Sequence, residues 1–190
     1  MKRVLVPLAP GFEEIEAVTI IDILRRADVH VTVAGTTDGP ITGSRGVVIT
    51  PDSTLDTVAD ATFDMVVLPG GGPGTDALRR DARIAVIVKR HADRGAWIAA
   101  ICAAPTVLAD LGLLTGRRAT SYPATQSELR SADYRTDRVV VDGRIITSRS
   151  PGTALEFALT LVESLVGRTV SRRITGDVLA LEADRVGAHD

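Results

Sequence analysis

The hydrophobic residues of this chain fall into short continuous runs, separated by longer segments in which apolar and charged residues mix. The runs are rich in valine and isoleucine, as in strands buried on both faces of a parallel sheet. They predict strands at residues 3–8, 29–35, 46–50 and 96–102, a strand with a glycine-rich turn at 64–74, and a short strand at 117–121. Residues 138–148 predict a β-hairpin with Asp142 and Gly143 at its turn.

The segments between these runs have the character of helices. They predict helices at residues 12–27, 83–95, 105–114 and 153–167. The first has acidic residues in its first turn and arginines in its last, which matches the helix dipole. Repeated alternation of strand and helix predicts an α/β fold, a mostly parallel sheet with helices on both faces. A length of 190 residues fits one domain, spanning residues 1–190.

Charge and composition argue against several classes of function. A formal net charge of −2 and the absence of a basic run make nucleic acid an unexpected partner. No apolar run reaches the roughly 18 residues of a membrane span, and the N-terminus reads as a first strand rather than a signal peptide. The single cysteine, Cys102, cannot form an internal disulfide, which suits a cytoplasmic protein.

Candidate chemistry gathers where the predicted strands end. In such sheets ligands bind beyond the carboxyl ends of the strands, and residues 7–16, 68–74 and 101–105 are expected there. Cys102 lies in the last of these segments, at a strand-to-helix turn where the helix dipole and free N–H groups favour thiolate. This predicts a lowered pKa for Cys102 and, in a sharp turn, a positive φ. The alternative is that Cys102 is a small buried hydrophobe.

Glu16 is the second candidate. It shares one stripe of the first predicted helix with Ile20, Ile23 and Ala27. A carboxyl group on an otherwise apolar stripe is partly desolvated, which raises its pKa. Such a group can donate a hydrogen bond to a thiolate or shuttle protons. The alternative is that Glu16, like its neighbours Glu13 and Glu14, is only an acidic residue in the first turn of a helix.

The glycine-rich stretch PGGGPG at residues 69–74 has two interpretations. The spacing Gly72-x-Gly74-x-x-Ala77 matches the loose dinucleotide-binding pattern, although it follows a later strand and no acid ends a strand about 20 residues on. The other interpretation is a nest of backbone N–H groups that binds an oxyanion beside the thiol.

The three histidines do not extend the candidate site. None of the three, His30, His91 and His189, lies at the carboxyl end of a predicted strand, so no Cys-His pair is readable. There is also no cluster of residues with metal-ligand spacing. The sequence therefore predicts a site without a metal.

Four motifs occur together in a familiar order: EEIEAV with Glu16, VVLPGG, AAICAAPTVLA with Cys102, and TSRSPGTALEFAL. From about residue 2 to about residue 170 the chain resembles the ThiJ/PfpI superfamily, in the parkinsonism-associated deglycase (DJ-one) branch with the bacterial YajL-type members. The resemblance implies a flavodoxin-like fold and a homodimer. It also implies that Cys102 is the reactive thiol, Glu16 its carboxyl partner, and Gly71 and Ala103 backbone donors beside it.

The same resemblance implies further pocket residues. Gly72 and Pro151 are expected to line the pocket, and Arg45, in GSRGVV, to reach the site of the partner subunit. The chain departs from the branch at Tyr122, which replaces a typical histidine. Tyr122 is expected either to orient substrate or water in the pocket, or simply to pack at a turn of the chain.

Two departures separate the chain from other branches. The protease-like branch has a histidine directly after the cysteine, and here Ala103 stands in that place. The glutamine amidotransferases of similar fold need a His-x-Glu late in the chain, and none is present.

Two functions follow from the resemblance. The first is a cofactor-independent enzyme of glyoxalase or deglycase type, in which Cys102 attacks a small 2-oxoaldehyde or a glycated adduct and Glu16 moves protons. The second is a stress-responsive or chaperone-like protein in which Cys102 senses peroxide. The same residues serve both functions.

Overall fold

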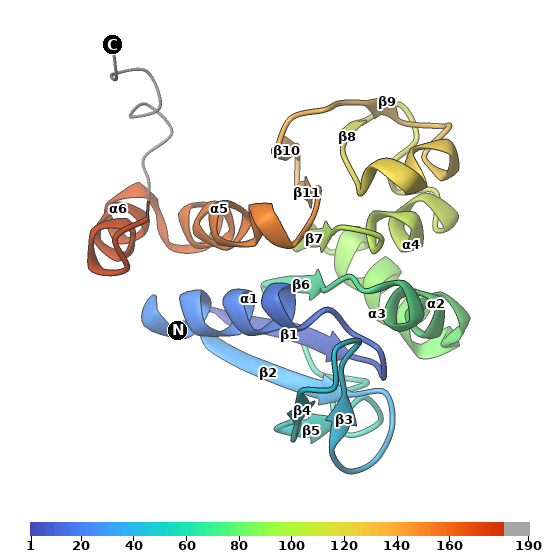
Figure 1. The fold of residues 1–190 in the computed structure, drawn as a ribbon, viewed down its shortest axis with the longest axis horizontal. Coiled ribbons are helices and arrows are strands. Elements are labelled where there is room, and N and C mark those ends of the chain that lie inside the picture. Colours follow the sequence, from blue (N-terminus) through green and yellow to red (C-terminus); the bar gives the residue numbers. More distant parts are fainter. Residues whose placement is uncertain (181–190) are drawn as a thin grey trace.

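A seven-stranded sheet forms the centre of the computed structural model, which describes residues 1–180 (Figure 1). Its strand order is β10-β11-β7-β6-β1-β2-β5. The bounds are β1 Arg3–Leu8, β2 His30–Gly35, β5 Ser53–Thr54, β6 Met65–Leu68, β7 Trp97–Ile101, β10 Val139–Asp142 and β11 Ile145–Ser148. Neighbouring strands pair in parallel, except that β10 and β11 form an antiparallel hairpin. The mostly parallel sheet is therefore confirmed.

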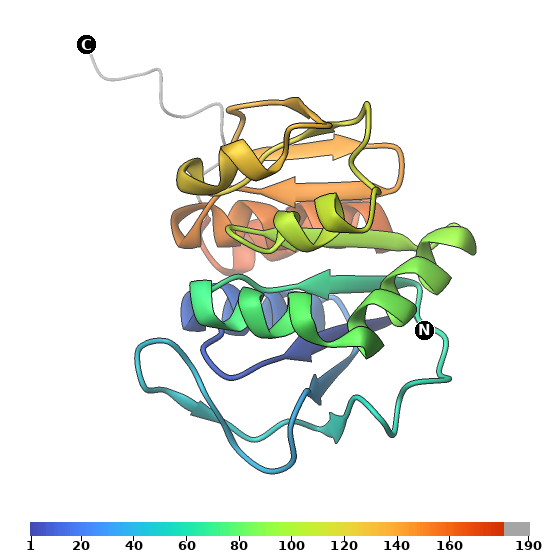
Figure 2. The same cartoon turned by 90° about the vertical axis from the view of Figure 1, so that its right-hand side faces the viewer.

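Helices cover both faces of this sheet, as predicted. One face carries α1 Glu14–Arg26, α5 Ala154–Val166 and α6 Arg168–Asp177, and the other α2 Gly72–Arg80, α3 Ala82–Asp93 and α4 Pro105–Asp110. Figure 2 shows the green helices in front of the sheet and the blue and red helices behind it. Alternate residues of β1 enter the two cores: Val4 and Val6 pack on one side and Leu5 on the other. Within residues 1–180, no helix is both long and apolar enough to span a bilayer.

The strand predicted at residues 46–50 is present in shorter form, but it lies outside the central sheet. The structure has β3 Ile41–Thr42 and β4 Val48–Ile49, which pair with each other in a separate antiparallel sheet. Val48 is largely exposed because this hairpin projects from the sheet, so its apolar side chains do not enter the core.

Other elements differ from their predicted boundaries for local reasons. The helix predicted at residues 105–114 ends at Asp110, shortly before Gly112 adopts a positive φ of 76°. The short strand at 117–121 is β8 Arg118–Ala119, which pairs with β9 Asp133–Tyr134 in a third sheet. Two 3-10 turns, Pro123–Glu128 and Pro151–Thr153, complete the described elements. Helices α2 and α6 are additions that the sequence did not predict.

Candidate active site

The carboxyl ends of the parallel strands bring the candidate residues together. The chain turns sharply after β7, and the backbone N–H of Cys102 donates to the carbonyl of Ser148 at the end of β11, at 3.0 Å. The carbonyl of Cys102 accepts from the N–H of Tyr122 at 2.8 Å. Because Gly70 follows β6 at the same edge, segments distant in sequence converge around the thiol.

The backbone of Cys102 is strained. Its φ is +63°, a value that side-chain-bearing residues rarely adopt and that costs on the order of 1–3 kcal/mol. The relative exposure of Cys102 is 9%, so the residue is mostly buried but still reaches solvent. The predicted positive φ is confirmed, and strain of this kind is characteristic of functional sites rather than of simple core packing.

Glu16 is buried completely beside this cysteine. Its relative exposure is 0%, and Ile20, Ile23 and Ala27 of the same stripe are buried as predicted. The N–H of Gly70 donates to Glu16 Oε2 at 2.8 Å. Glu16 Oε1 is buried without a hydrogen-bond partner among residues 1–180, so it is available to exchange a proton.

The start of α1 holds Glu16 in place. Glu13 is the N-cap, and its side-chain oxygen accepts from the N–H of Glu16 at 2.8 Å. The N–H of Glu13 donates to the carbonyl of Gly70 at 2.9 Å. Hydrogen bonds in both directions thus tie the helix start to the loop after β6. The capping role of a first-turn acid belongs to Glu13, whereas Glu16 points into the site.

Gly70 allows this close approach. A methyl group added there would lie 2.6 Å from Glu16 Oε2 and 2.7 Å from Cβ of Cys102. These two side chains therefore flank the same small space. The sequence did not single out either Gly70 or the bonding role of Glu13. The signal for both was weak, since one lies in a run of glycines and the other among several acidic residues.

The glycine-rich turn packs on protein backbone rather than leaving room for a nucleotide. A methyl group on Gly71 would meet the carbonyl oxygen of Gly11 at 2.4 Å, and one on Gly74 would meet Phe12 at 2.8 Å. The turn is filled by the segment that leads into α1. The N–H groups of Gly71 and Ala103 instead lie near the thiol, where they favour its charged form.

Burial dominates the electrostatics of the pair. Burial raises the pKa of Glu16 to about 7, against the lowering effect of the Gly70 N–H and of Cys102. Burial and the neighbouring Glu16 carboxylate raise the pKa of Cys102 to about 12, and the N–H groups of Gly71 and Ala103 only partly offset this. The prediction of a lowered pKa for Cys102 is therefore wrong, because desolvation outweighs the amides and the dipole of the short helix α4.

The raised pKa of Glu16 predicts a pH-dependent stability. A carboxyl group whose pKa is higher in the folded state stabilises the fold fully below its unfolded pKa, and this contribution is lost as the pH rises through 7. Relative to the ordinary glutamate pKa of 4.5, the loss amounts to about 3 kcal/mol in the free energy of unfolding. Glu16→Gln should therefore match wild type near about pH 5 and exceed it near about pH 8. Urea denaturation at both pH values measures this, and parallel pH profiles of the two proteins would contradict it.

The remaining predicted pocket residues are less closely tied to the thiol. The backbone N–H of Tyr122 bonds to the carbonyl of Cys102, but Tyr122 is 44% exposed. Pro151 opens the 3-10 turn that follows β11, and Gly72 opens α2 with open space around its Cα. Arg45 is exposed, and its N–H donates to the carboxylate of Glu14 on α1. The roles of these side chains stay predictions.

The histidines lie elsewhere, where the structure describes them. His30 is exposed at the start of β2, and His189 lies outside the described residues. His91 is buried, with Nδ1 2.7 Å from the carbonyl of Ile87 and Nε2 accepting from the N–H of Phe63. Among residues 1–180, no three His, Cys, Asp or Glu side chains are grouped to hold a metal ion.

The site thus joins a strained cysteine after β7 to a buried glutamate from α1. Comparison with known proteins shows the family of the whole chain. The family model described as "DJ-1/PfpI family" matches residues 2–164. The chain belongs to the DJ-1/PfpI family.

Relatives in this family cover nearly the whole chain. Protein dj-1beta of Drosophila melanogaster is 45% identical over 181 residues, 94% of this chain and 97% of that protein. The crystal structure of Drosophila melanogaster DJ-1beta matches with a TM-score of 0.93 at 44% identity, covering 95% of this chain and 99% of that one. Glutathione-independent glyoxalase DJR-1.2 of Caenorhabditis elegans is 38% identical, over 87% of this chain and 90% of that protein. The resemblance to this family and the flavodoxin-like fold are thereby confirmed.

Proposed function

We propose that this DJ-1/PfpI protein is a cofactor-independent enzyme that converts small 2-oxoaldehydes into 2-hydroxy acids, with Cys102 as nucleophile and Glu16 as proton carrier. The observation that carries the proposal is the buried Glu16 carboxyl group beside the strained, slightly exposed Cys102. A relative that covers most of the chain is named a glutathione-independent glyoxalase, which supports the same reaction class.

The first step is addition of the thiol to the aldehyde. With a pKa of about 7, Glu16 is partly ionised near neutral pH, whereas the thiol, with a pKa of about 12, keeps its proton. Glu16 therefore acts as a general base: it takes the S–H proton as the sulfur–carbon bond forms. The carbonyl electrons move onto oxygen, which the N–H groups of Gly71 and Ala103 can stabilise until it is protonated.

The later steps move protons and add one water. The former aldehyde carbon of the hemithioacetal loses its proton, and the neighbouring carbonyl carbon gains one, which yields a thioester of a 2-hydroxy acid. Water then breaks the carbon–sulfur bond and restores the thiol. One carbon is oxidised while its neighbour is reduced, so the reaction needs no external oxidant or reductant. Lactate formation from methylglyoxal by wild type and by Cys102→Ala tests the proposal.

The same arrangement supports a second function, peroxide sensing. Oxidation of Cys102 gives an anionic sulfinate, and the N–H groups of Gly71 and Ala103 near the sulfur suit such an anion. Thiolate is the reactive form in both functions, so the raised pKa of the thiol does not separate them. We favour the enzyme because a relative that covers most of the chain is named a glutathione-independent glyoxalase.

We also propose that the protein acts as a homodimer through α1 and the β3–β4 hairpin. Exposed apolar side chains lie on both elements: Ile15 (58% exposed) and Val18 (47%) on α1, and Val47 (50%) and Val48 (57%) on the hairpin. Glu14 joins the two elements by accepting from the N–H of Arg45 and from the Ser44 hydroxyl. Arg45 is exposed beside this surface, which suits its expected reach into the partner's site.

Sedimentation velocity tests the dimer. Wild type is expected to sediment as a dimer at micromolar concentration, and Val18→Lys to shift toward monomer because it places a charge within an apolar interface. Val86→Lys is the matched control, since Val86 is 62% exposed on α3, on the other side of the sheet. A monomeric wild type, or equal behaviour of the two variants, would refute this interface.

A further inference from the structure

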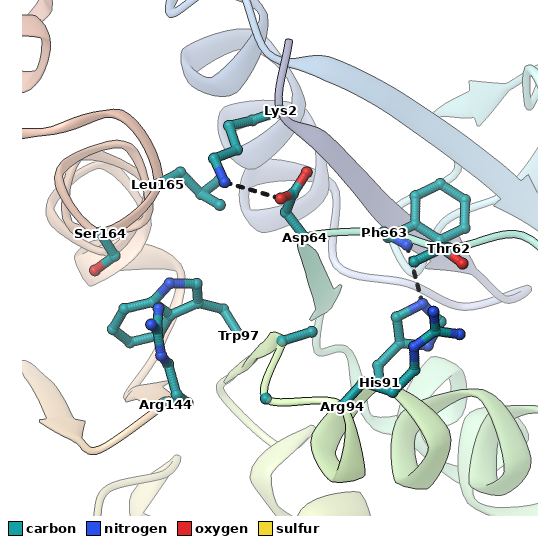
Figure 3. Close-up of a pocket in the computed structure, with 12 residues that line it drawn as sticks. Lys2, Thr62, Phe63, Asp64, His91, Arg94, Trp97, Arg144, Ser164 and Leu165 are labelled. Carbon is teal, nitrogen blue, oxygen red and sulfur yellow. Dashed lines mark hydrogen bonds and ion pairs between the residues drawn. The ribbon is translucent and has the colours of Figure 1, made fainter.

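A cavity of about 380 Å³ lies at the edge of the sheet opposite Cys102 (Figure 3). Its lining includes the residues at or just before the start of β1, β6, β7 and β11, four adjacent parallel strands. Cys102 follows the other end of β7, so the length of that strand separates the cavity from the candidate active site. The volume falls within the range of small-molecule sites.

Positive charge dominates the lining. Lys2, Arg94 and Arg144 contribute three cations and Asp64 one anion, which leaves two net positive charges. Asp64 is already satisfied, because it accepts from Lys2 Nζ and from the N–H of Arg3, both at 2.9 Å. Neither Arg94 nor Arg144 forms an ion pair or a side-chain hydrogen bond within residues 1–180. Both guanidinium groups are therefore available to a ligand.

His91 adds no charge to the site. Its Nε2 accepts from the N–H of Phe63, and its Nδ1 lies 2.7 Å from the carbonyl of Ile87, so both nitrogens are occupied in the neutral ring. Burial, together with the nearby Arg90 and Arg94, lowers its pKa, while the Ile87 carbonyl raises it. The electrostatic character of the cavity comes from the arginines.

Flat apolar surface lies between the charges. The guanidinium of Arg144 lies over the indole ring of Trp97, 4.7 Å from its centroid. A guanidinium held in this way keeps N–H donors at its edge, in the geometry that binds a carboxylate through two hydrogen bonds. Phe63 and Leu165 add further apolar lining. Figure 3 shows the Trp97–Arg144 pair on one side of the view and Arg94 beside His91 on the other.

We propose that this cavity binds a small organic dianion of dicarboxylate type, with one carboxylate on Arg144, the other toward Arg94, and an apolar body against Trp97. Two cations on different walls match two acidic groups on one molecule, and the net charge of the lining matches a dianion. The site is independent of the chemistry at Cys102.

The only tryptophan of the chain reports on this site. Trp97 fluorescence can be followed as terephthalate, a flat ring with carboxylates at opposite ends, is added to the protein. Benzoate, with one carboxylate, and terephthalamide, with none, are the matched probes of lower charge. We expect saturable quenching by terephthalate with an apparent Kd below about 1 mM, weaker binding of benzoate, and no binding of the neutral amide. Binding should weaken as salt is added.

Variants locate the binding. Arg144→Gln and Arg94→Gln are each expected to weaken terephthalate binding at least about fivefold, because each removes a charge-assisted contact. Arg172→Gln, an exposed arginine of α6, is the matched control and should not change it. Calorimetry supplies a second readout, since loss of Arg144 also alters the surroundings of Trp97. The proposal fails if wild type shows no saturable binding of terephthalate up to about 10 mM. It also fails if the neutral amide binds as well as terephthalate does, or if Arg172→Gln weakens binding as much as the two cavity variants do.

Discussion

Replacing Cys102 with alanine is expected to reduce lactate formation from methylglyoxal to the uncatalysed rate. The substitution removes the atom that forms the covalent intermediate, and no other cysteine exists in the chain to replace it. Glu16→Gln should lower kcat by at least about 100-fold, because the amide cannot take the thiol proton. Its carbonyl oxygen can still accept from the N–H of Gly70, so the loss reports proton transfer rather than a collapsed site.

The two variants also separate the proposed function from its alternative. Initial rates of lactate formation are measured enzymatically, with thermal unfolding as the control for folding. Loss of activity in both variants, with folding preserved, supports a Cys-Glu enzyme. Equal rates in wild type and both variants would eliminate the enzyme and leave peroxide sensing as the function of the same thiol.

Much of this architecture is readable from the sequence because the central strands are buried on both faces. Strands in such a sheet must be continuously apolar, as are the runs around Val4 in β1 and Val66 in β6. Such runs can be recognised in the sequence alone. Helix α2 was missed because its first turn holds two glycines and a proline, and α6 because it is largely polar. A strand around Val48 is present as predicted, but its place outside the central sheet is not readable from the sequence, because valine favours strands wherever they lie.

The candidate site shows a similar division. The position of Cys102 after a strand and the apolar stripe around Glu16 predicted burial, a raised pKa for the glutamate and a positive φ for the cysteine. The direction of the shift in the thiol pKa could not be predicted from the sequence. It depends on the balance between desolvation and nearby N–H groups, and that balance is set by how closely the Gly70 loop and α1 approach the sulfur.

Gly70→Ala is expected to disrupt this approach. The added methyl group would lie 2.6 Å from Glu16 Oε2, 2.7 Å from Cβ of Cys102 and 2.9 Å from the carbonyl oxygen of Ile101. None of these neighbours can move freely, because Glu16 is fully buried and the backbone of Cys102 is already strained. We expect a loss of about 1–3 kcal/mol in the free energy of unfolding from overpacking. A shift of the glutamate relative to the thiol of about 1 Å would cost roughly 100-fold in kcat.

Gly176→Ala is the matched control for this substitution. Gly176 lies in α6 and has no neighbouring atom within 4 Å of an added methyl group. Helix α6 lies away from the turn between β7 and α4 that holds the thiol (Figure 1). Alanine there should leave kcat unchanged and raise stability slightly, because it reduces the conformational freedom of the unfolded chain. Urea denaturation and lactate assays on both variants give the comparison. If Gly70→Ala retained wild-type kcat, the Cys102–Glu16 pair would tolerate displacement, and direct proton transfer between them could not be the basis of catalysis.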